Sequence, residues 1–516
     1  MKLSRRLFLL SPLALVYKPS WGALSFPLPQ GHFVPAKMPM HPVYPRPDSE
    51  TQSHARHRWA HPDFRYEIPI GVQGGAWPFN YEIITGPSGA TIGEYYGDPD
   101  YGVVKWTPAN GDSGTTTFTV RVTDQELNTV DLTWTTTIDA NQFVFVDANA
   151  TSTGSGTFSD PLKTFSDWYK GDVNDSTYHN KIIVFRGGNY VGVGNATSGN
   201  FTLSATTKTP SLIGYPDETA IIDCSAGKFT GGMDDLFIAG LVFKNARTDV
   251  SNPRFFDTGS LWNRGTWFNV VFDTMGLGTA NDDNPACIYL SRASDTLKRY
   301  NILVKNVSFE NITANGGNGA FVDFYICNNV LVEGCAARNS NTSYGLWMKA
   351  TQSFVTIRNN DLSDNVTGMA ICLGYTQGET NGVLPHDHEV CWNNLRNSIA
   401  PDDLRNLFVM NNNWAGKHYN TYIYRNTFGV VRFRYPGTDP FETDSNVAVS
   451  TDVADWSDST LVAEGIPNLI RSPTDLVLDR QGQLKGEYRQ NHLGIVGHEA
   501  SDKIKIPNKP TSPHIT

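Results

Sequence analysis

The sequence predicts an all-β protein in which a small antiparallel β-sandwich precedes a right-handed parallel β-helix. Charged residues are scarce, at 18% of the 516 residues, whereas the β-branched and aromatic residues that favour strands are common. Short alternating runs of polar and apolar residues follow one another between residues 61 and 139. After residue 140, apolar strand-like runs return roughly every 25 to 37 residues, a spacing that is typical of solenoid repeats.

Residues 1–23 have the pattern of a signal peptide. Arg5 and Arg6 precede an apolar run, and small residues follow it up to Ala23. The segment Ser4–Leu9 is similar to the twin-arginine export motif, so that route and ordinary secretion both remain open. No later apolar run approaches the ~18 residues of a membrane span. We therefore expect a chain exported to the periplasm, the cell surface or the medium, with no membrane span in its mature form.

Residues 24–60 are expected to form an extended linker or a wrapping arm. A proline-rich chain is stiff and extended, and it does not by itself build a domain. The prolines of this stretch are Pro27, Pro29, Pro35, Pro39, Pro42, Pro45 and Pro47.

Residues 61–139 are expected to fold as a small antiparallel sandwich, because alternating strands and turn residues recur at short intervals. The run from Trp106 to Asn110 and the strand from Phe118 to Asp124 resemble the immunoglobulin-like and cadherin-like modules that are appended to bacterial secreted enzymes. This resemblance implies a spacer or packing role without chemistry.

Residues 140–440 open with a strand at Phe143–Ala148, a Gly/Ser turn, a short amphipathic segment that holds Trp168 and Tyr169, and a strand at Ile182–Tyr190. This order resembles the start of pectin-lyase-like β-helix domains, in which a capping helix precedes the first full strand. The resemblance implies a right-handed parallel β-helix. A β-propeller is the alternative, but its blades of ~40 to 50 residues are longer than most of these repeats. Residues 441–516 lose the repeat and are expected to form a cap and a polar tail.

Asparagine recurs where the predicted strands end, at Asn306, Asn359 and Asn426. Asparagine tolerates the left-handed backbone conformation and can hydrogen-bond along a stack of identical turns. These positions therefore fit coils that are stacked one on another.

A second set of strands in the repeats predicts one exposed column of side chains, because successive side chains in a strand point to opposite sides. The inward set would be Ile288, Leu290, Val322, Phe324, Leu346, Met348, Ile371, Leu373, Val431 and Phe433. The outward set would then be Tyr289, Asp323, Tyr325, Trp347, Lys349, Arg432 and Arg434. A shift of one residue in register would exchange the two sets.

This outward column suits an anionic polysaccharide, because aromatic faces stack on sugar rings and cations bind uronate groups. β-Elimination from a uronic acid requires a base for the C5 proton, and a lysine can serve only if its pKa is lowered. Lys349 is the candidate base, and Arg432 or Arg434 would stabilise the enolate-like intermediate. An isolated lysine on a solenoid is also commonly a solvated surface residue.

The strand Gly345–Thr351 followed by Val355–Asn360 resembles lyase-like β-helix domains in which a lysine occupies such a strand. The resemblance implies lyase activity on a polysaccharide. The aspartate clusters of calcium-dependent pectate lyases and the paired aspartates of β-helix hydrolases are not found in register. A hydrolase would need two carboxylates across one groove, for which Asp323 with Asp361 or Asp364 are the candidates.

Two predicted loops carry other candidate groups. The loop from Gly374 to Glu389 contains Tyr375 for sugar binding, and His386 and His388 as a base or as metal ligands. Asp282 and Asp283 suit Ca²⁺ ligation, and they suit an ordinary turn equally well. Calcium is therefore the one cofactor that the sequence suggests.

The net charge of −10 argues against nucleic acid as a partner, because phosphate binding needs an excess of Lys and Arg. The main prediction is therefore a secreted lyase that acts on an anionic polysaccharide. The alternatives are a glycoside hydrolase and a non-catalytic protein, such as an adhesin, an envelope component or a glycan-binding module, because the fold does not decide function.

Overall fold

The structure is a computed structural model. It describes residues 36–169, 178, 180–192, 200–204, 211–232, 234–258, 263–278, 284–290, 299–314, 318–349, 353–362, 365–374, 386–395, 405–410, 419–424, 426–428, 431–434, 441–444, 447–449, 461–462 and 469–471. Among these residues, none of the helices has both the length and the apolar character that a membrane crossing requires.

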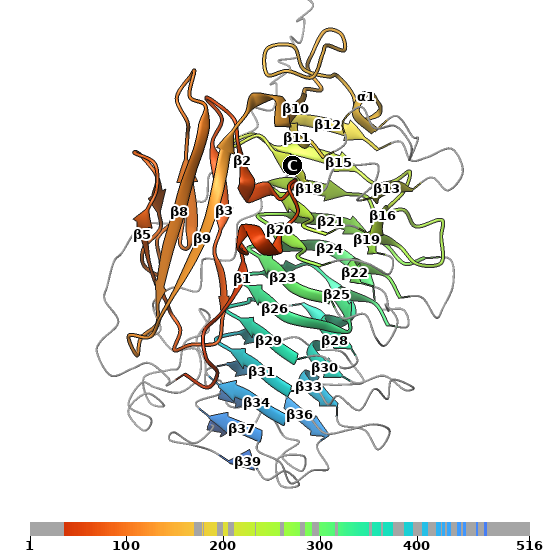
Figure 1. Cartoon of the computed structure of the whole chain (residues 1–516). Helices are drawn as coiled ribbons and strands as arrows, with labels where there is room; N and C mark the ends of the chain where they lie inside the picture. The colour runs from red at the N-terminus through yellow and green to blue at the C-terminus, as the bar shows by residue number, and fades with distance from the viewer. Residues whose placement is uncertain are drawn as a thin grey trace, which may run out of the picture.

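The body of the protein is a solenoid of parallel strands stacked coil on coil, with three strand-bearing faces (Figure 1). Face 1 consists of β10 (Phe143–Val146), β11 (Ile182–Phe185), β14 (Ser211–Gly214), β17 (Phe237–Ala239), β20 (Thr266–Phe268), β23 (Arg299–Lys305), β26 (Cys327–Glu333), β29 (Ser353–Arg358), β31 (His386–Cys391), β34 (Tyr419–Tyr424), β37 (Phe441–Asp444) and β39 (Leu461–Val462). The predicted parallel β-helix architecture is thereby confirmed.

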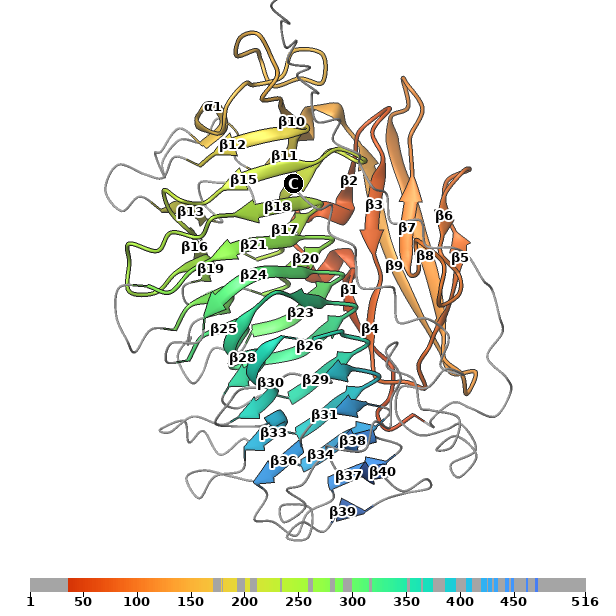
Figure 2. The ribbon, with the colours of Figure 1, turned by 180° about the vertical axis from the view of Figure 1, so that it is seen from behind.

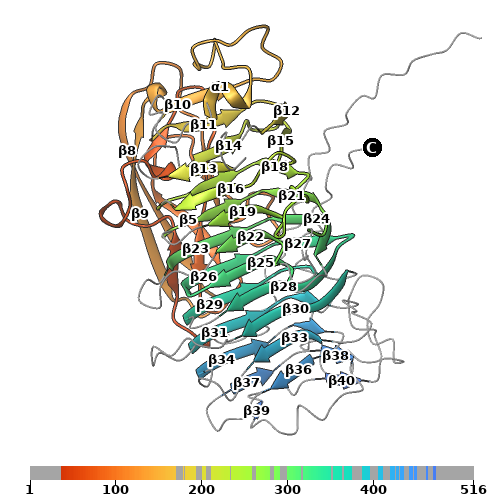
Figure 3. The same cartoon turned by 90° about the vertical axis from the view of Figure 1, so that its right-hand side faces the viewer.

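Faces 2 and 3 follow face 1 in most coils. Face 2 consists of β12 (Gly188–Val191), β15 (Ala220–Asp223), β18 (Leu241–Lys244), β21 (Val271–Met275), β24 (Ser308–Ala314), β27 (Ala336–Arg338), β32 (Asn394–Leu395), β35 (Thr427–Phe428), β38 (Val447–Val449) and β40 (Leu469–Arg471). Face 3, which Figure 3 shows, consists of β13 (Phe201–Ser204), β16 (Phe229–Gly232), β19 (Arg254–Thr258), β22 (Ala286–Leu290), β25 (Ala320–Tyr325), β28 (Asn341–Lys349), β30 (Val366–Gly374), β33 (Arg405–Met410) and β36 (Val431–Arg434). Strand pairing continues past residue 440 through β37 to β40, so the solenoid extends into the predicted cap.

Apolar side chains from all three faces fill the inside of the solenoid. Equivalent phenylalanines stack between coils, as Phe272 and Phe309 do with ring centroids 5.8 Å apart and planes 11° apart. The first coils are covered by α1 (Phe165–Tyr169), which buries Trp168 and Tyr169 as the sequence predicts. Each coil alone would expose its apolar face, and stacking removes that surface from water.

The corner between faces 1 and 2 explains the recurrent asparagines. Asn306 and Asn359 are both in the left-handed conformation, each with φ of 55°, as the sequence predicts. Asn426 belongs instead to a buried ladder with Asn360 and Asn393. In this ladder the side-chain amide of each asparagine donates to the carboxamide oxygen of the next at 2.9 Å.

The N-terminal module packs against face 1 (Figures 1 and 2). One of its sheets has the order β2 (Trp59–Ala60), β9 (Thr129–Ile138), β8 (Gly114–Thr123), β5 (Asn80–Thr85), and the other has the order β3 (Tyr66–Pro69), β7 (Val103–Trp106), β6 (Thr91–Ile92). The outer side of face 1 joins the core of the module through apolar residues such as Phe143, Phe237, Leu303 and Leu331. The small antiparallel unit is thus confirmed as sheets, and it packs side by side with the solenoid.

The structure describes the proline-rich segment from residue 36. It forms β1 (His41–Tyr44), which pairs antiparallel with β4 (Gly71–Gln73), and then the single-turn 3₁₀ helices η1 (Asp48–Glu50) and η2 (Arg56–Arg58). A third such turn, η3 (Ala140–Gln142), connects the module to β10. We call residues 36–58 the arm. This described part of the predicted linker or arm contacts both the module and the solenoid.

A buried ionic cluster fastens the module to face 1. Glu333 lies between Lys305 and Arg358, with N–O distances of 3.1 and 2.6 Å. The Lys305 ammonium also donates to the carbonyl of Ile70 at 3.0 Å, and Arg358 donates to the carbonyl of Val72. Both cations therefore have acceptors on the module as well as on the solenoid.

Candidate functional site

The register of face 3 aligns the residues that the sequence placed in one column. Asp257, Tyr289, Asp323, Trp347, Cys372, Phe408 and Arg432 are successive partners in neighbouring parallel strands. The inward set from Ile288 to Leu373 lies in the solenoid core. Residues as far apart in sequence as Asp257 and Trp347 thereby follow one another along the same outer side, as period two predicted, and the backbone register continues to Arg432.

The centre of this column is an ion pair between Lys349 and Asp323. The ammonium nitrogen lies 2.8 Å from Asp323 Oδ2. Both residues are almost completely buried, with Asp323 0% and Lys349 1% exposed. The other oxygen, Asp323 Oδ1, has no hydrogen-bond partner among the described residues. The column thus points away from the solenoid core, but its central charges are covered, in contrast to the exposed column that the sequence predicts.

Aromatic rings provide part of that cover. The Lys349 ammonium lies 3.3 Å from the centroid of the Trp347 ring and 4.6 Å from that of Tyr325. Trp347 in turn stacks on Tyr344, with centroids 3.7 Å apart. A cation over an aromatic face is attracted by the electrons of the ring, and the attraction is stronger where water is excluded. These rings hold the lysine close to Asp323.

Burial moves the pKa values of the pair toward each other. Loss of solvation raises the pKa of Asp323 to about 6, although Lys349 and Arg254 oppose this change. Loss of solvation lowers the pKa of Lys349, and the Asp323 carboxylate opposes that change. The environment therefore favours the neutral form of both groups more than water does, and a lysine base needs such a shift.

Arg254 is a member of the site that the sequence interpretation missed. Its guanidinium carbon lies 3.5 Å from the centroid of the Tyr289 ring, and its Nη1 lies 3.0 Å from an oxygen of Asp257. Asp257 also pairs with Lys228. Strict alternation does not reveal this strand, because Phe255 and Phe256 are adjacent and both lie in the solenoid core. Its pairing with β22 is apparent only in the structure.

The other predicted cations occupy the same face further along the solenoid. Arg432 pairs with Phe408 in backbone register, and Arg434 pairs with Met410. Arg432 is three strands beyond Trp347, which corresponds to about 14 Å at the usual strand spacing. Arg254 lies on the opposite side of the Lys349–Asp323 pair. Tyr375, Asp282 and Asp283 fall outside the described residues.

The structure does not place the two histidines in a loop beside this column. His386 and His388 lie in β31 of face 1, where they pair with Ser353 and Val355 of β29. Val355 points into the solenoid core, and His388 at the next coil is 2% exposed. The prediction that both histidines lie in a loop is therefore wrong, because their segment is a strand that continues the stack. Residues 375–385 of the predicted loop fall outside the described residues.

Of the carboxylate pairs considered for a hydrolase, Asp323 and Asp361 lie on different faces. Asp361 forms bridges with Ala336 and Asn394 at the start of face 2, whereas Asp323 is in face 3. Asp364 falls outside the described residues. In the described part of the chain, no group of three or more His, Cys, Asp and Glu side chains could hold a metal ion.

Comparisons with models of known protein families and with curated proteins gave no match.

Proposed function

We propose that the protein binds an anionic, uronic-acid-containing polysaccharide along face 3 and cleaves it by β-elimination. The observation that carries this proposal is the buried Lys349–Asp323 pair, which lies among aromatic rings with Arg254 on the same face. A linear polymer suits a flat stack of parallel strands, because sugar units and coils both repeat at regular intervals.

In the proposed reaction, the Lys349 proton first passes to Asp323, which leaves a neutral amine. The amine then accepts the C5 proton of a uronate, a C4–C5 double bond forms, and the glycosidic oxygen at C4 leaves with its electron pair. The leaving oxygen takes up the proton held by Asp323, which restores the Lys349–Asp323 ion pair. Arg254, or Arg432 and Arg434 from the other end of face 3, would balance the charge of the enolate-like intermediate. The opposed pKa shifts of Lys349 and Asp323 support the first step, because burial favours the neutral pair.

The product carries a conjugated double bond that absorbs ultraviolet light, so the test is an absorbance assay with alginate, pectate, ulvan and glycosaminoglycans. We expect the wild-type protein to release such a product from at least one of them. Lys349→Ala should reduce the rate by about 10²- to 10⁴-fold, the usual loss for a general base. Lys244→Ala is the matched control, since this lysine lies on face 2 and pairs with Asp273. Equal rates for wild type and Lys349→Ala would refute the assignment.

A non-catalytic glycan-binding or structural role is the second candidate, and the burial of the Lys349–Asp323 pair favours it. Under this proposal the pair and its aromatic rings stabilise the stack of coils, and the protein binds a polysaccharide without forming a product. Lys349→Ala would then lower the free energy of unfolding. Neither the wild-type protein nor this variant would release a product that absorbs ultraviolet light.

A further inference from the structure

The arm carries a histidine, His57, at the place where the arm, the module and the solenoid meet. Its carbonyl oxygen accepts hydrogen bonds from Tyr66 Oη at 2.7 Å and from Thr136 Oγ1 at 2.8 Å, which fixes its backbone to the module. Its ring packs edge-on against Tyr44, with centroids 5.6 Å apart, and Tyr44 packs on Phe237 of face 1 at 5.8 Å. His57 is 0% exposed.

The surroundings of this ring do not suit a positive charge. Neither ring nitrogen has a hydrogen-bond partner among the described residues. Arg56 and Arg58 flank the histidine in the arm, and Arg264 faces it from the solenoid. Burial lowers the pKa of His57 to about 3, and the three arginines contribute to the same change. A protonated imidazole would therefore be buried beside three cations with no acceptor.

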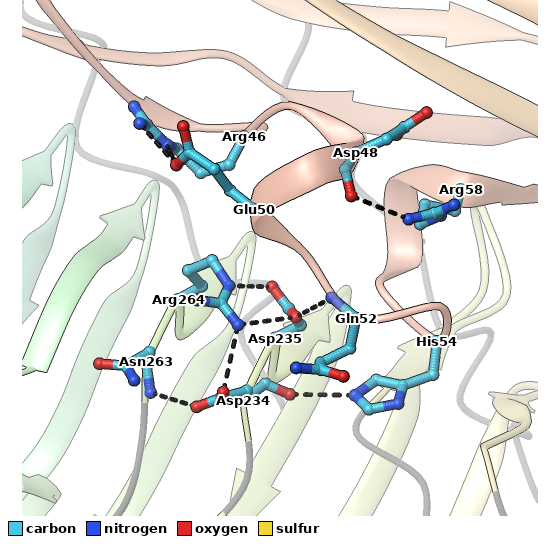
Figure 4. Close-up of polar contacts among 10 residues, drawn as sticks. All are labelled: Arg46, Asp48, Glu50, Gln52, His54, Arg58, Asp234, Asp235, Asn263 and Arg264. Carbon is cyan, nitrogen blue, oxygen red and sulfur yellow. Dashed lines mark hydrogen bonds and ion pairs between the residues drawn. The ribbon is translucent and has the colours of Figure 1, made fainter.

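Beside this ring, polar contacts join the arm to one corner of the solenoid (Figure 4). Arg264 pairs with Asp235 at 2.6 Å and with Asp234 at 3.2 Å. The arm adds the backbone N–H of Gln52, which donates to Asp235 Oδ2 at 2.8 Å, and His54 Nε2, which lies 3.2 Å from the carbonyl oxygen of Asp234. We call Asp234, Asp235 and Arg264 the corner clasp.

We propose that His57 is an acid-sensitive latch whose protonation releases the arm from the corner clasp. A free histidine has a pKa of about 6.5. Because the docked ring is held neutral, docking is at full strength above about pH 6.5 and is lost progressively as the pH falls toward the docked pKa. The docking equilibrium should weaken on the order of 100-fold between about pH 7 and pH 4.5.

Other titratable groups lie around the ring and in the arm. Burial raises the pKa of Asp235, although Arg264 and the Gln52 N–H of the arm oppose this change. Burial also raises the pKa values of Tyr44 and Tyr66, which therefore stay neutral over this range. Burial and Arg46 also lower the pKa of His41 at the other end of the arm, so variants of His57 are needed to separate the contributions of the two histidines. The proposal does not depend on any polysaccharide.

The test of this proposal is amide hydrogen exchange of the full chain at about pH 7 and pH 4.5. The exchange rates are corrected for the intrinsic exchange rate at each pH. We expect amides in the segment 41–60 to lose protection at pH 4.5 while the solenoid core keeps it. His57→Phe should remove most of the pH dependence, and His57→Gln serves the same purpose if phenylalanine prevents folding. His54→Gln, on the same arm, should retain it. Equal protection of the wild-type arm at both pH values, or an unchanged acid response in both His57 variants, would overturn the proposal.

Discussion

Individual side chains show where the sequence is informative and where it is not. Period two correctly separated Leu346 and Met348, which face the core, from Trp347 and Lys349, which do not. The burial of Lys349 could not be predicted, because its cover comes from Asp323 and Tyr325 of the preceding coil. Exposure in a solenoid depends on neighbours that are remote in sequence, and period alone does not identify them.

The buried asparagine ladder gives a prediction at this scale. Asn393 accepts from the backbone and side-chain amides of Asn360, and it donates to Asn426 and to the Ile357 carbonyl. Asn393→Ala should leave several buried groups without partners and lower the free energy of unfolding by about 1 to 3 kcal/mol. Chemical denaturation measures this loss. Asn110→Ala is the control at an exposed position, and a similar loss there would show that the ladder has no special role.

Single elements were predicted unevenly. The capping helix and the strands of the repeat follow from apolar patterns that each segment carries within itself. The arm and β31 do not follow from such patterns. Proline content indicates that the arm is extended, but it does not identify the surface that the arm covers. Likewise His386 and His388 are polar residues in a strand that pairs on both sides. Tertiary pairing overrides local composition in both segments.

The ionic cluster between face 1 and the module gives a prediction at the scale of elements. Glu333→Gln should leave Lys305 and Arg358 as buried cations without their common anion, and breaking a buried pair costs about 3 to 5 kcal/mol. Thermal or chemical unfolding of the full chain measures this cost. Glu310→Gln on face 2 is the control, since its carboxylate is partly exposed and accepts from Ser308. A Glu333→Gln variant as stable as this control would show that the cluster does not fasten the module.

At the scale of the whole molecule, the solenoid and the module share one apolar core across face 1. The fold class was predictable because repeats and turn residues report it directly, and the resemblance to pectin-lyase-like domains led to the same fold. The side-by-side packing of the module was not predictable, since the outer apolar residues of face 1 are not distinguished in sequence from those that face inward. The proposed activity therefore rests on the geometry of face 3.

The most direct test of the central claim is a crystal structure of the Lys349→Ala variant. The crystal is soaked with a short oligomer of the polyuronate that the wild-type protein degrades or binds. We predict sugar rings along face 3 beside Trp347, with a uronate carboxylate within hydrogen-bonding distance of the Arg254 guanidinium. An oligomer bound on face 2 or on the module, with face 3 unchanged, would contradict the account.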